Sequence, residues 1–352
     1  MKRFTWLVTI LFMISGCNFK PEAEPLPLSV NATLNLLQEN PQFVMYLNFK
    51  SMRRTEFWKK NISDSLFNVE KTFGSLLNTF KMATGASLSE GLDELYYSNS
   101  WFGENAIVMK GVFDKSKLNE YLMTDSLFSI AKYAGTIPIY IKNDIGLYFF
   151  FKDDFTLCAS NYLKQLDIMN ETKDTSQSGL LTNQKLYDAV RNIIYKEDLW
   201  MVSTEKIFIR GIFQNFVETT SSVKLEDYDS LNSEGKVLND SAADNEKLSI
   251  INLYKKFSSV SFSAKMTKDL KFLVQCECIN EESAKYFRSI LNGFITVSKF
   301  SSARNKESGS SNIFEKLKLD RYDNSVFIEL NVDDSNLQEL RKTNLMSEPK
   351  SY

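Results

Sequence analysis

The chain has 352 residues, of which 43% are hydrophobic and 13% aromatic, and its formal net charge is −2. This composition contains enough apolar residues for a folded core, and it lacks the basic excess expected of a protein that binds nucleic acid. The chain contains no histidine, which excludes a Ser-His-Asp or Cys-His triad, a histidine-ligated zinc and a histidine general base.

Residues 1–16 have the pattern of a signal peptide. Lys2 and Arg3 form a charged start, and residues 4–14 form an apolar segment that is too short for a transmembrane helix, which needs about 20 residues. The segment ends in Ile14-Ser15-Gly16-Cys17. Removal of residues 1–16 takes away two basic residues and changes the net charge to −4.

These four residues resemble the lipobox of bacterial lipoproteins, in which a branched apolar residue and two small residues precede an invariant cysteine. The resemblance implies that a signal peptidase recognises Ile14, Ser15 and Gly16, that the Cys17 thiol receives a diacylglycerol, and that the new amino terminus is acylated too. These acyl chains together would anchor the protein almost permanently to the membrane.

Asn18 follows the cysteine, whereas an aspartate there is the usual signal for inner-membrane retention in enterobacterial lipoproteins. We therefore expect an outer-membrane lipoprotein of the cell envelope, on the periplasmic face or exposed at the surface.

Residues 17–39 are predicted to form the lipid anchor and a flexible tether. Pro21, Pro25 and Pro27 occur there without hydrophobic periodicity, which is typical of an extended spacer. The folded body is expected to follow, and the tail at 344–352 to lie outside it.

The first half of the body is predicted at 40–195. We expect a strand at 43–49, a helical region at 51–82, and a hairpin that turns at 102–104. Asp114 should cap the next helix. Strands at 137–143 and 146–152, joined through Asp144, should precede a strand at 154–160 and a helix from about Asn161.

The second half is predicted at 196–343 and repeats this order. It begins with a strand at 199–203 and a helix at 205–217, and a disordered insertion at 219–246 follows. The later elements are a hairpin at 258–266 and 269–279, a helix at 281–300, and a strand at 325–332 that leads into a helix. We therefore predict an α+β fold built by tandem duplication of a strand-helix-hairpin-helix-strand unit with antiparallel sheets. The alternative is coincidence between common α/β hairpin units.

The order of elements, the leader and several phrases resemble a bacterial envelope family classed only as a domain of unknown function. The phrases are GVFDKSKLNEYL, YAGTIPIYIKNDIGLYFFFKDDFTLCASN and GLLTNQKLYDAV. The family offers no catalytic residue to assign to this chain.

Three cysteines remain after Cys17. Alternation along the strand places Leu270, Phe272, Val274, Cys276 and Cys278 on one face, the expected core face. Neighbouring positions on the same strand face are too far apart for a normal disulfide, so Cys276 and Cys278 should not pair with each other. Buried free thiols, a disulfide from Cys158 to Cys276 or Cys278, and a metal or redox role remain open. A metal site would need further ligands that the sequence does not supply.

Two groups of carboxylates have structural explanations. Asp227 and Asp229 have a spacing used in calcium loops, but the third ligand and the glycine of an EF-hand are missing, so a solvated, mobile insertion is favoured over a calcium site. The pairs Asp153-Asp154 and Asp333-Asp334 stand at a strand turn and a helix start, where turn formation and capping account for them.

The aromatic strand at 147–151 has two interpretations. Both of its faces carry large apolar residues, so it is either enclosed in the core or it lines an apolar groove for a lipid, peptide or glycan.

Three functions from different classes fit these patterns. We favour a non-catalytic, lipid-anchored envelope protein that acts as a binding or scaffold module, without cofactor or metal. Its partners would be the membrane, through Cys17, and an envelope protein or an apolar ligand, but no nucleic acid. The alternatives are a periplasmic carrier of an apolar small molecule or lipid, which requires an enclosed pocket, and a histidine-free hydrolase, which requires converging carboxylates or a Ser-Lys pair.

Overall fold

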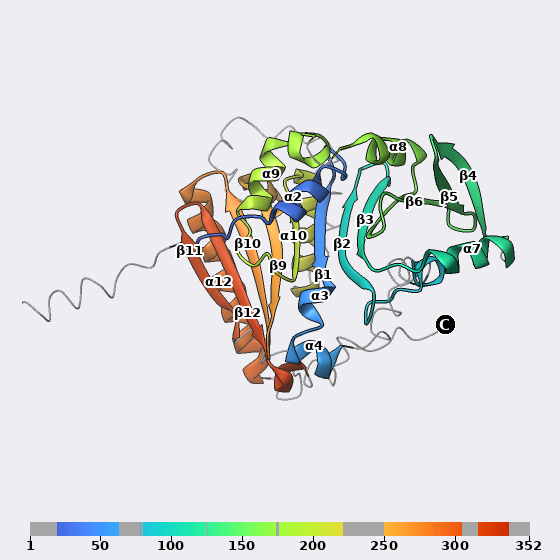
Figure 1. The fold of residues 1–352 in the computed structure, drawn as a ribbon. Coiled ribbons are helices and arrows are strands. Elements are labelled where there is room, and N and C mark those ends of the chain that lie inside the picture. Colours follow the sequence, from blue (N-terminus) through green and yellow to red (C-terminus); the bar gives the residue numbers. More distant parts are fainter. Residues whose placement is uncertain are drawn as a thin grey trace, which may run out of the picture.

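The structure is a computed structural model, and it describes residues 20–62, 78, 80–124, 126–173, 176–220, 250–304 and 316–337. Within these ranges the strands form one 12-stranded sheet in the order β11-β12-β10-β9-β8-β1-β2-β3-β7-β6-β5-β4. All neighbouring strands are antiparallel. The sheet twists strongly and carries helices on both faces (Figure 1), which confirms the α+β class.

The first half of the chain supplies the strands from the centre of the sheet to one edge. They are β1 (Phe43–Asn48), β2 (Leu92–Asn99), β3 (Asn105–Gly111), β4 (Phe128–Ala134), β5 (Ile137–Lys142), β6 (Leu147–Phe151) and β7 (Thr156–Ser160). Among the described residues, the helices of this half are α2 (Leu28–Leu34), α3 (Phe49–Met52), α4 (Glu56–Asn61), α7 (Lys115–Thr124), α8 (Leu163–Glu171), α9 (Gln184–Arg191) and the 3₁₀ helix η1 (Gly179–Thr182).

The second half supplies the other five strands. They are β8 (Leu199–Ser203), β9 (Phe257–Met266), β10 (Leu270–Cys278), β11 (Lys318–Tyr322) and β12 (Ser325–Val332). The helices here are α10 (Lys206–Thr220), α12 (Glu281–Arg304) and the 3₁₀ helix η2 (Ile250–Lys256).

The two halves meet at the centre of the sheet, where β1 pairs with β8 and Tyr46 lies opposite Trp200. From this centre the strands follow the orders β1-β2-β3-β7-β6 and β8-β9-β10-β12-β11. The first half then adds β5 and β4. The halves therefore share one sheet, and the expectation of a separate sheet in each half is wrong because β1 and β8 pair directly.

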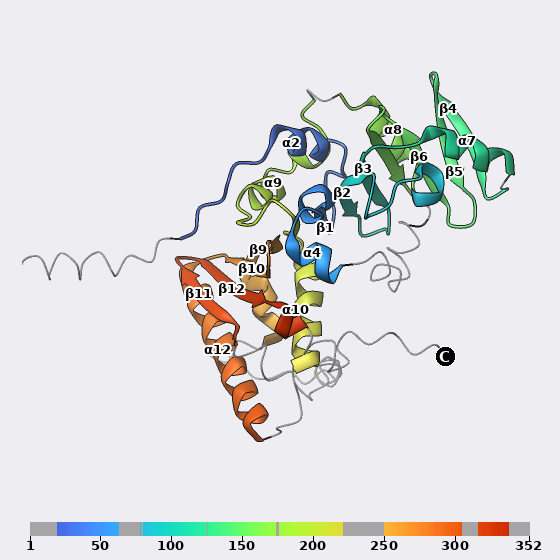
Figure 2. The same cartoon turned by 60° about the horizontal axis from the view of Figure 1, so that its bottom comes forward.

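The sheet has a core on each face. We call face A the face of Val44 and Tyr46, which pack in one cluster with Leu34, Leu166 and Val190 of α2, α8 and α9. Face B is the opposite face. On face B, the strands of the first half pack against α3, α4 and α7, and the strands of the second half pack against Ile209 of α10 and Phe287 of α12. Figure 2 shows α2 and α9 on one side of the second-half strands and α10 and α12 on the other.

Local signals explain several elements. The predicted cap of α7 is present, because the Ser116 amide donates to Asp114 Oδ1 at 3.0 Å. Asp153 Oδ1 accepts from the Phe155 amide at 2.7 Å in a strand turn, and Asp333 Oδ1 accepts from the Asn336 amide at 2.9 Å at a helix start. The turn between β2 and β3 contains Gly103 at φ +77°, a conformation that side chains disfavour. The hydrogen bonds of Asp153 and Asp333 confirm the structural roles predicted for the pairs Asp153-Asp154 and Asp333-Asp334.

The aromatic strand β6 is enclosed, as the first interpretation predicts. Leu147 and Phe149 belong to the face-B core, whereas Phe150 belongs to the face-A core and Tyr148 packs against it. The side chains of this strand are therefore packed in the two cores.

Two sequence predictions fail within the described residues. Phe272 does not share the core position of Cys276 and Cys278: 39% of it is exposed, and neither face-B cluster of the second half includes it. The segment at 17–39 is not a tether throughout. Residues 28–34 form α2, and Leu34 and Leu37 are almost fully buried in the face-A core, because α2 covers strands that would otherwise expose apolar side chains.

Several predicted features lie outside the described residues. These are the leader with Ile14, Ser15 and Gly16, the acylation site Cys17, the carboxylates Asp227 and Asp229, nearly all of the insertion at 219–246, and the tail at 344–352.

Candidate functional site

The cysteines do not form a site. Cys158, Cys276 and Cys278 are free and buried, and Cys158 packs in the face-A core whereas the other two pack on face B. Burial raises the pKa of Cys158 and of Cys278 to about 12 and that of Cys276 well above its ordinary value. Buried free thiols are confirmed, and the disulfide alternative is wrong because the sheet separates Cys158 from the other two. Such thiols are poor nucleophiles.

Beside the second-half strands, a groove opens on face A. Residues 20–26, which we call the strap, run across this face and form one wall. The opposite wall comes from α9 and the residues after it, and the floor comes from β9 and β10. The groove has a volume of about 870 Å³, within the range typical of small-ligand sites, about 300–1,000 Å³.

The floor is polar because β9 and β10 alternate. Ser259, Ser261 and Ser263 point to face A, whereas Val260 and Ala264 belong to the face-B cores. The register places Ser261 opposite Gln275 and Ser259 opposite Glu277. The described helices of the second half, α10 and α12, pack on face B, so the floor of the groove is lined by hydroxyl and amide groups.

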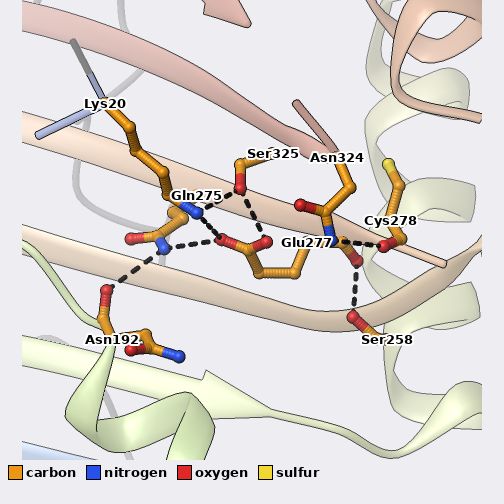
Figure 3. A network of polar contacts seen from close by, with 8 residues as sticks. All are labelled: Lys20, Asn192, Ser258, Gln275, Glu277, Cys278, Asn324 and Ser325. Carbon is orange, nitrogen blue, oxygen red and sulfur yellow. Dashed lines mark hydrogen bonds and ion pairs between the residues drawn. The ribbon is translucent and has the colours of Figure 1, made fainter. Parts of the chain in front are cut away.

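Glu277 is the centre of a hydrogen-bond network at the end of the groove (Figure 3). Its Oε1 accepts from Lys20 Nζ at 3.3 Å and from Gln275 Nε2 at 2.9 Å, and its Oε2 accepts from the Ser325 hydroxyl at 2.7 Å. Lys20 Nζ also lies 2.6 Å from Ser325 Oγ. The start of the strap is therefore attached to β10 and β12.

A second attachment holds the other end of the strap. Lys196 is 7% exposed, and its Nζ donates to the carbonyl oxygens of Glu24 and Arg191. Burial lowers the pKa of Lys196 to about 8, while nearby Glu24 opposes this shift and Arg191 adds to it. The Lys20 side chain is 40% exposed, and exposed ion pairs contribute only about 0–1 kcal/mol, so Lys196 is the stronger attachment.

The groove contains an unpaired acceptor. Gln275 is 4% exposed, and its Nε2 donates to the Asn192 carbonyl oxygen at 3.1 Å as well as to Glu277. Its Oε1 has no partner among the described residues. An amide flip would place this oxygen against two other acceptors, so the network fixes the orientation. A buried acceptor without a donor costs about 1–3 kcal/mol.

The charges along the groove are mixed. Both signs line it: Lys20, Lys185 and Arg191 against Glu22, Glu24, Asp188 and Glu277. Apolar groups of the strap, such as Leu26, share the walls with these side chains. The groove thus offers donors, acceptors and some apolar surface, without a dominant sign of charge.

The structure brings a serine and a lysine together, which the hydrolase alternative requires. However, Ser325 is 0% exposed, its hydroxyl donates to Glu277, and Lys20 forms an ion pair with the same carboxylate. A catalytic pair needs an accessible hydroxyl and a lysine that can take its proton. This geometry suits a structural attachment. Within the described ranges no three His, Cys, Asp or Glu side chains are grouped to hold a metal ion.

Sequence reasoning missed the groove, although part of the signal was present. The alternation of serine with Val260, Phe262 and Ala264 predicts a strand with one polar face. Gln275 and Glu277 give the next strand a polar face too. Nothing local indicates that the strap lies over this face, because its contacts to Glu277 and Lys196 join residues far apart in the chain.

Comparisons with known proteins find no family match, and the solved structures that match are similar to this chain at a low level. No protein-family model and no curated protein matches the chain. Crystal form III of TP0453 is 8% identical with a TM-score of 0.44, covering 86% of this chain and 95% of that chain. Crystal form I of TP0453 is 7% identical with a TM-score of 0.44, and the match covers 94% of this chain and 100% of that chain. Likeness at this level carries no argument about fold or function. In the part of the chain that is described, no helix has the length and apolar character needed to cross a bilayer.

Proposed function

We propose that this chain is a non-catalytic, lipid-anchored binding module of the cell envelope, and that it binds a polar ligand in the groove beneath the strap. The observation that carries the proposal is the groove itself, which has Ser259, Ser261 and Gln275 on its floor and the strap and α9 as its walls. A groove lined by hydroxyl, amide and charged side chains is suited to a polar ligand.

The anchor supports a location at the membrane. Lys20 is three residues from Cys17, and a fully extended chain spans at most about 3.6 Å per residue. The Cα atom of Cys17 would therefore lie within about 11 Å of the Cα atom of Lys20, whose side chain contacts Glu277. Asn18 favours the outer membrane. The groove would open beside the lipid surface, with the body held close to it.

The chemistry of the walls favours a polar ligand over the alternative of an apolar cargo. An apolar molecule in this groove would cover hydroxyl, amide and charged groups without giving them hydrogen bonds, which is unfavourable. The enclosed Ser325 likewise favours binding over hydrolysis.

We also propose that the two halves arose by tandem duplication. The matching strand orders on either side of the β1–β8 pair support this origin. In that case the β4–β5 hairpin is an addition to the first half, and the polar face A of the second half is a later specialisation.

The test of the anchor is the mature protein isolated from its own cells. We expect its mass to include three acyl chains and its amino terminus to be at Cys17, and we expect it to sediment with membranes. Cys17→Ser should abolish acylation and release the protein from the membrane fraction or leave it unprocessed. A mature wild-type chain without acyl mass would contradict the proposal.

A further inference from the structure

We infer that the groove binds a neutral oligosaccharide, an inference that rests on the proposed binding function and specifies its ligand. Three observations lead to this class of ligand: the unpaired groups on the floor, the balance of charges, and the pairing of the floor strands on both sides.

The floor groups call for a ligand rich in hydroxyls. Three buried side-chain atoms in the described residues lack a partner, namely Asp198 Oδ1, Trp200 Nε1 and Gln275 Oε1, and of these residues only Gln275 lines the groove. The Ser259 and Ser261 hydroxyls also line it and have no hydrogen bond to any described residue. A hydroxyl both donates and accepts, so a saccharide can satisfy the amide oxygen and the two serines together.

The charges disfavour an ionic ligand. Glu277 is occupied by three donors, and Arg191 stacks over the Tyr187 ring at 5.8 Å and pairs with Asp188 at 3.8 Å. Glu277 and Asp188 are thus each paired with a cation of the wall, Lys20 and Arg191. A ligand with a net charge would meet repulsion from one set as much as attraction from the other, whereas a neutral ligand meets hydrogen-bonding groups of both kinds.

The strands disfavour a peptide bound by strand addition. This mode requires a free sheet edge, but β9 pairs with β8 and β10, and β10 pairs with β9 and β12. The floor presents side chains alone, and the strap adds apolar residues such as Pro25 and Leu26 to the lining of the groove. Side-chain hydroxyls and amides combined with apolar patches match the hydroxyl edges and C–H faces of a sugar ring.

The test is calorimetric titration of the mature, acylated protein in detergent micelles. The probes are maltotetraose, tetra-N-acetylchitotetraose, tetra-alanine and palmitate. We expect at least one of the two saccharides to bind, with an affinity that changes little between 50 and 500 mM salt because the ligand is neutral.

Three variants locate the binding. Gln275→Leu should weaken saccharide binding at least tenfold, about 1.4 kcal/mol, and Ser261→Ala, which changes the fold less, should weaken it several-fold. Gln165→Leu is the matched control, because Gln165 is a buried glutamine, 7% exposed, that donates to the Leu36 carbonyl oxygen outside the groove. It should bind as the wild type does.

Each outcome decides a separate claim. No saccharide binding at millimolar concentration, or binding that Gln275→Leu and Ser261→Ala leave unchanged, would overturn the inference. Binding of tetra-alanine or palmitate in place of a saccharide, lost in Gln275→Leu, would overturn the ligand class but keep the groove as a binding site. The anchor is tested separately by the acyl mass.

Discussion

Cys158 lies in β7 with no exposed surface, and burial raises the pKa of its thiol to about 12. Neighbouring Lys152 and Lys110 lower this pKa, but their effect is smaller than that of burial. The ordinary thiol pKa is about 8.5, so the folded state keeps a proton that the unfolded chain loses above that pH. Folding stability from this group is complete below about pH 8.5 and is lost as the pH rises toward about 12.

This pKa difference predicts a loss of folding stability at alkaline pH, which substitution of Cys158 should remove. Cys158→Ala should lower stability at pH 7 by about 1 kcal/mol. Above pH 8.5 this deficit should shrink by up to about 1.4 kcal/mol per pH unit and then reverse, so that the variant is the more stable protein at pH 10.5. Urea unfolding of both proteins at several pH values measures it. Leu157→Ala, on the same strand and 2% exposed, is the control with a constant deficit. A constant deficit for Cys158→Ala as well would mean that the thiol ionises in the fold.

At the scale of elements, α2 decides where the tether ends. The exposure of its side chains differs strongly: Leu34 is 0% exposed in the face-A core, whereas Leu28 in the same helix is 86% exposed. Pro27 stands at the amino-terminal cap of the helix, so the prolines that suggest a spacer lead directly into a packed element. Residues 28–39 therefore belong to the folded body.

The packing of α2 predicts that replacing Leu34 lowers the stability of the fold strongly and that replacing Leu28 hardly changes it. Leu34→Ala should destabilise the protein by about 2–5 kcal/mol through the cavity it leaves. Leu28→Ala should stay within about 0.5 kcal/mol of the wild type. Chemical denaturation provides both values. Equal and small effects would restore the tether prediction for this segment.

The elements that could be predicted are those with a strong periodic pattern. The strand at 199–203 and the strand at 325–332 match β8 and β12 residue for residue, because apolar residues dominate them. The edge strands β4 and β11 were missed. They pair on one side only and alternate half-buried with exposed residues, so their pattern is close to that of a loop.

The groove could be predicted only in part for a related reason. Alternation in β9 and β10 encodes a polar face, but it does not encode what covers that face. The α9 helix has Leu186 and Val190 at helical spacing, a usable signal that the sequence predictions above did not include. The contacts of Lys20 and Lys196 with distant residues depend on the whole fold, so no local pattern contains them.

At the scale of the whole molecule, the strap fixes how the body would sit on a membrane. Lys20 contacts β10 and β12 at the end of the sheet where Glu277 lies opposite Ser259. Lys255 precedes β9 at that end, and Lys268 lies in the turn between β9 and β10 at the other end. The ten residues of β9 separate the two lysines by about 30 Å. An anchor at Cys17 would place Lys255 near the lipid and Lys268 far from it.

The orientation of the body on the membrane can be measured by energy transfer from the body to acceptor-labelled lipid headgroups. The acylated protein would be reconstituted in vesicles and labelled at Lys255→Cys or at Lys268→Cys, both exposed sites, while the three buried thiols should react slowly. We expect clearly more efficient transfer from position 255 than from position 268. Equal transfer from both positions, as for a body that tumbles on a flexible tether, or more efficient transfer from 268, would contradict this expectation.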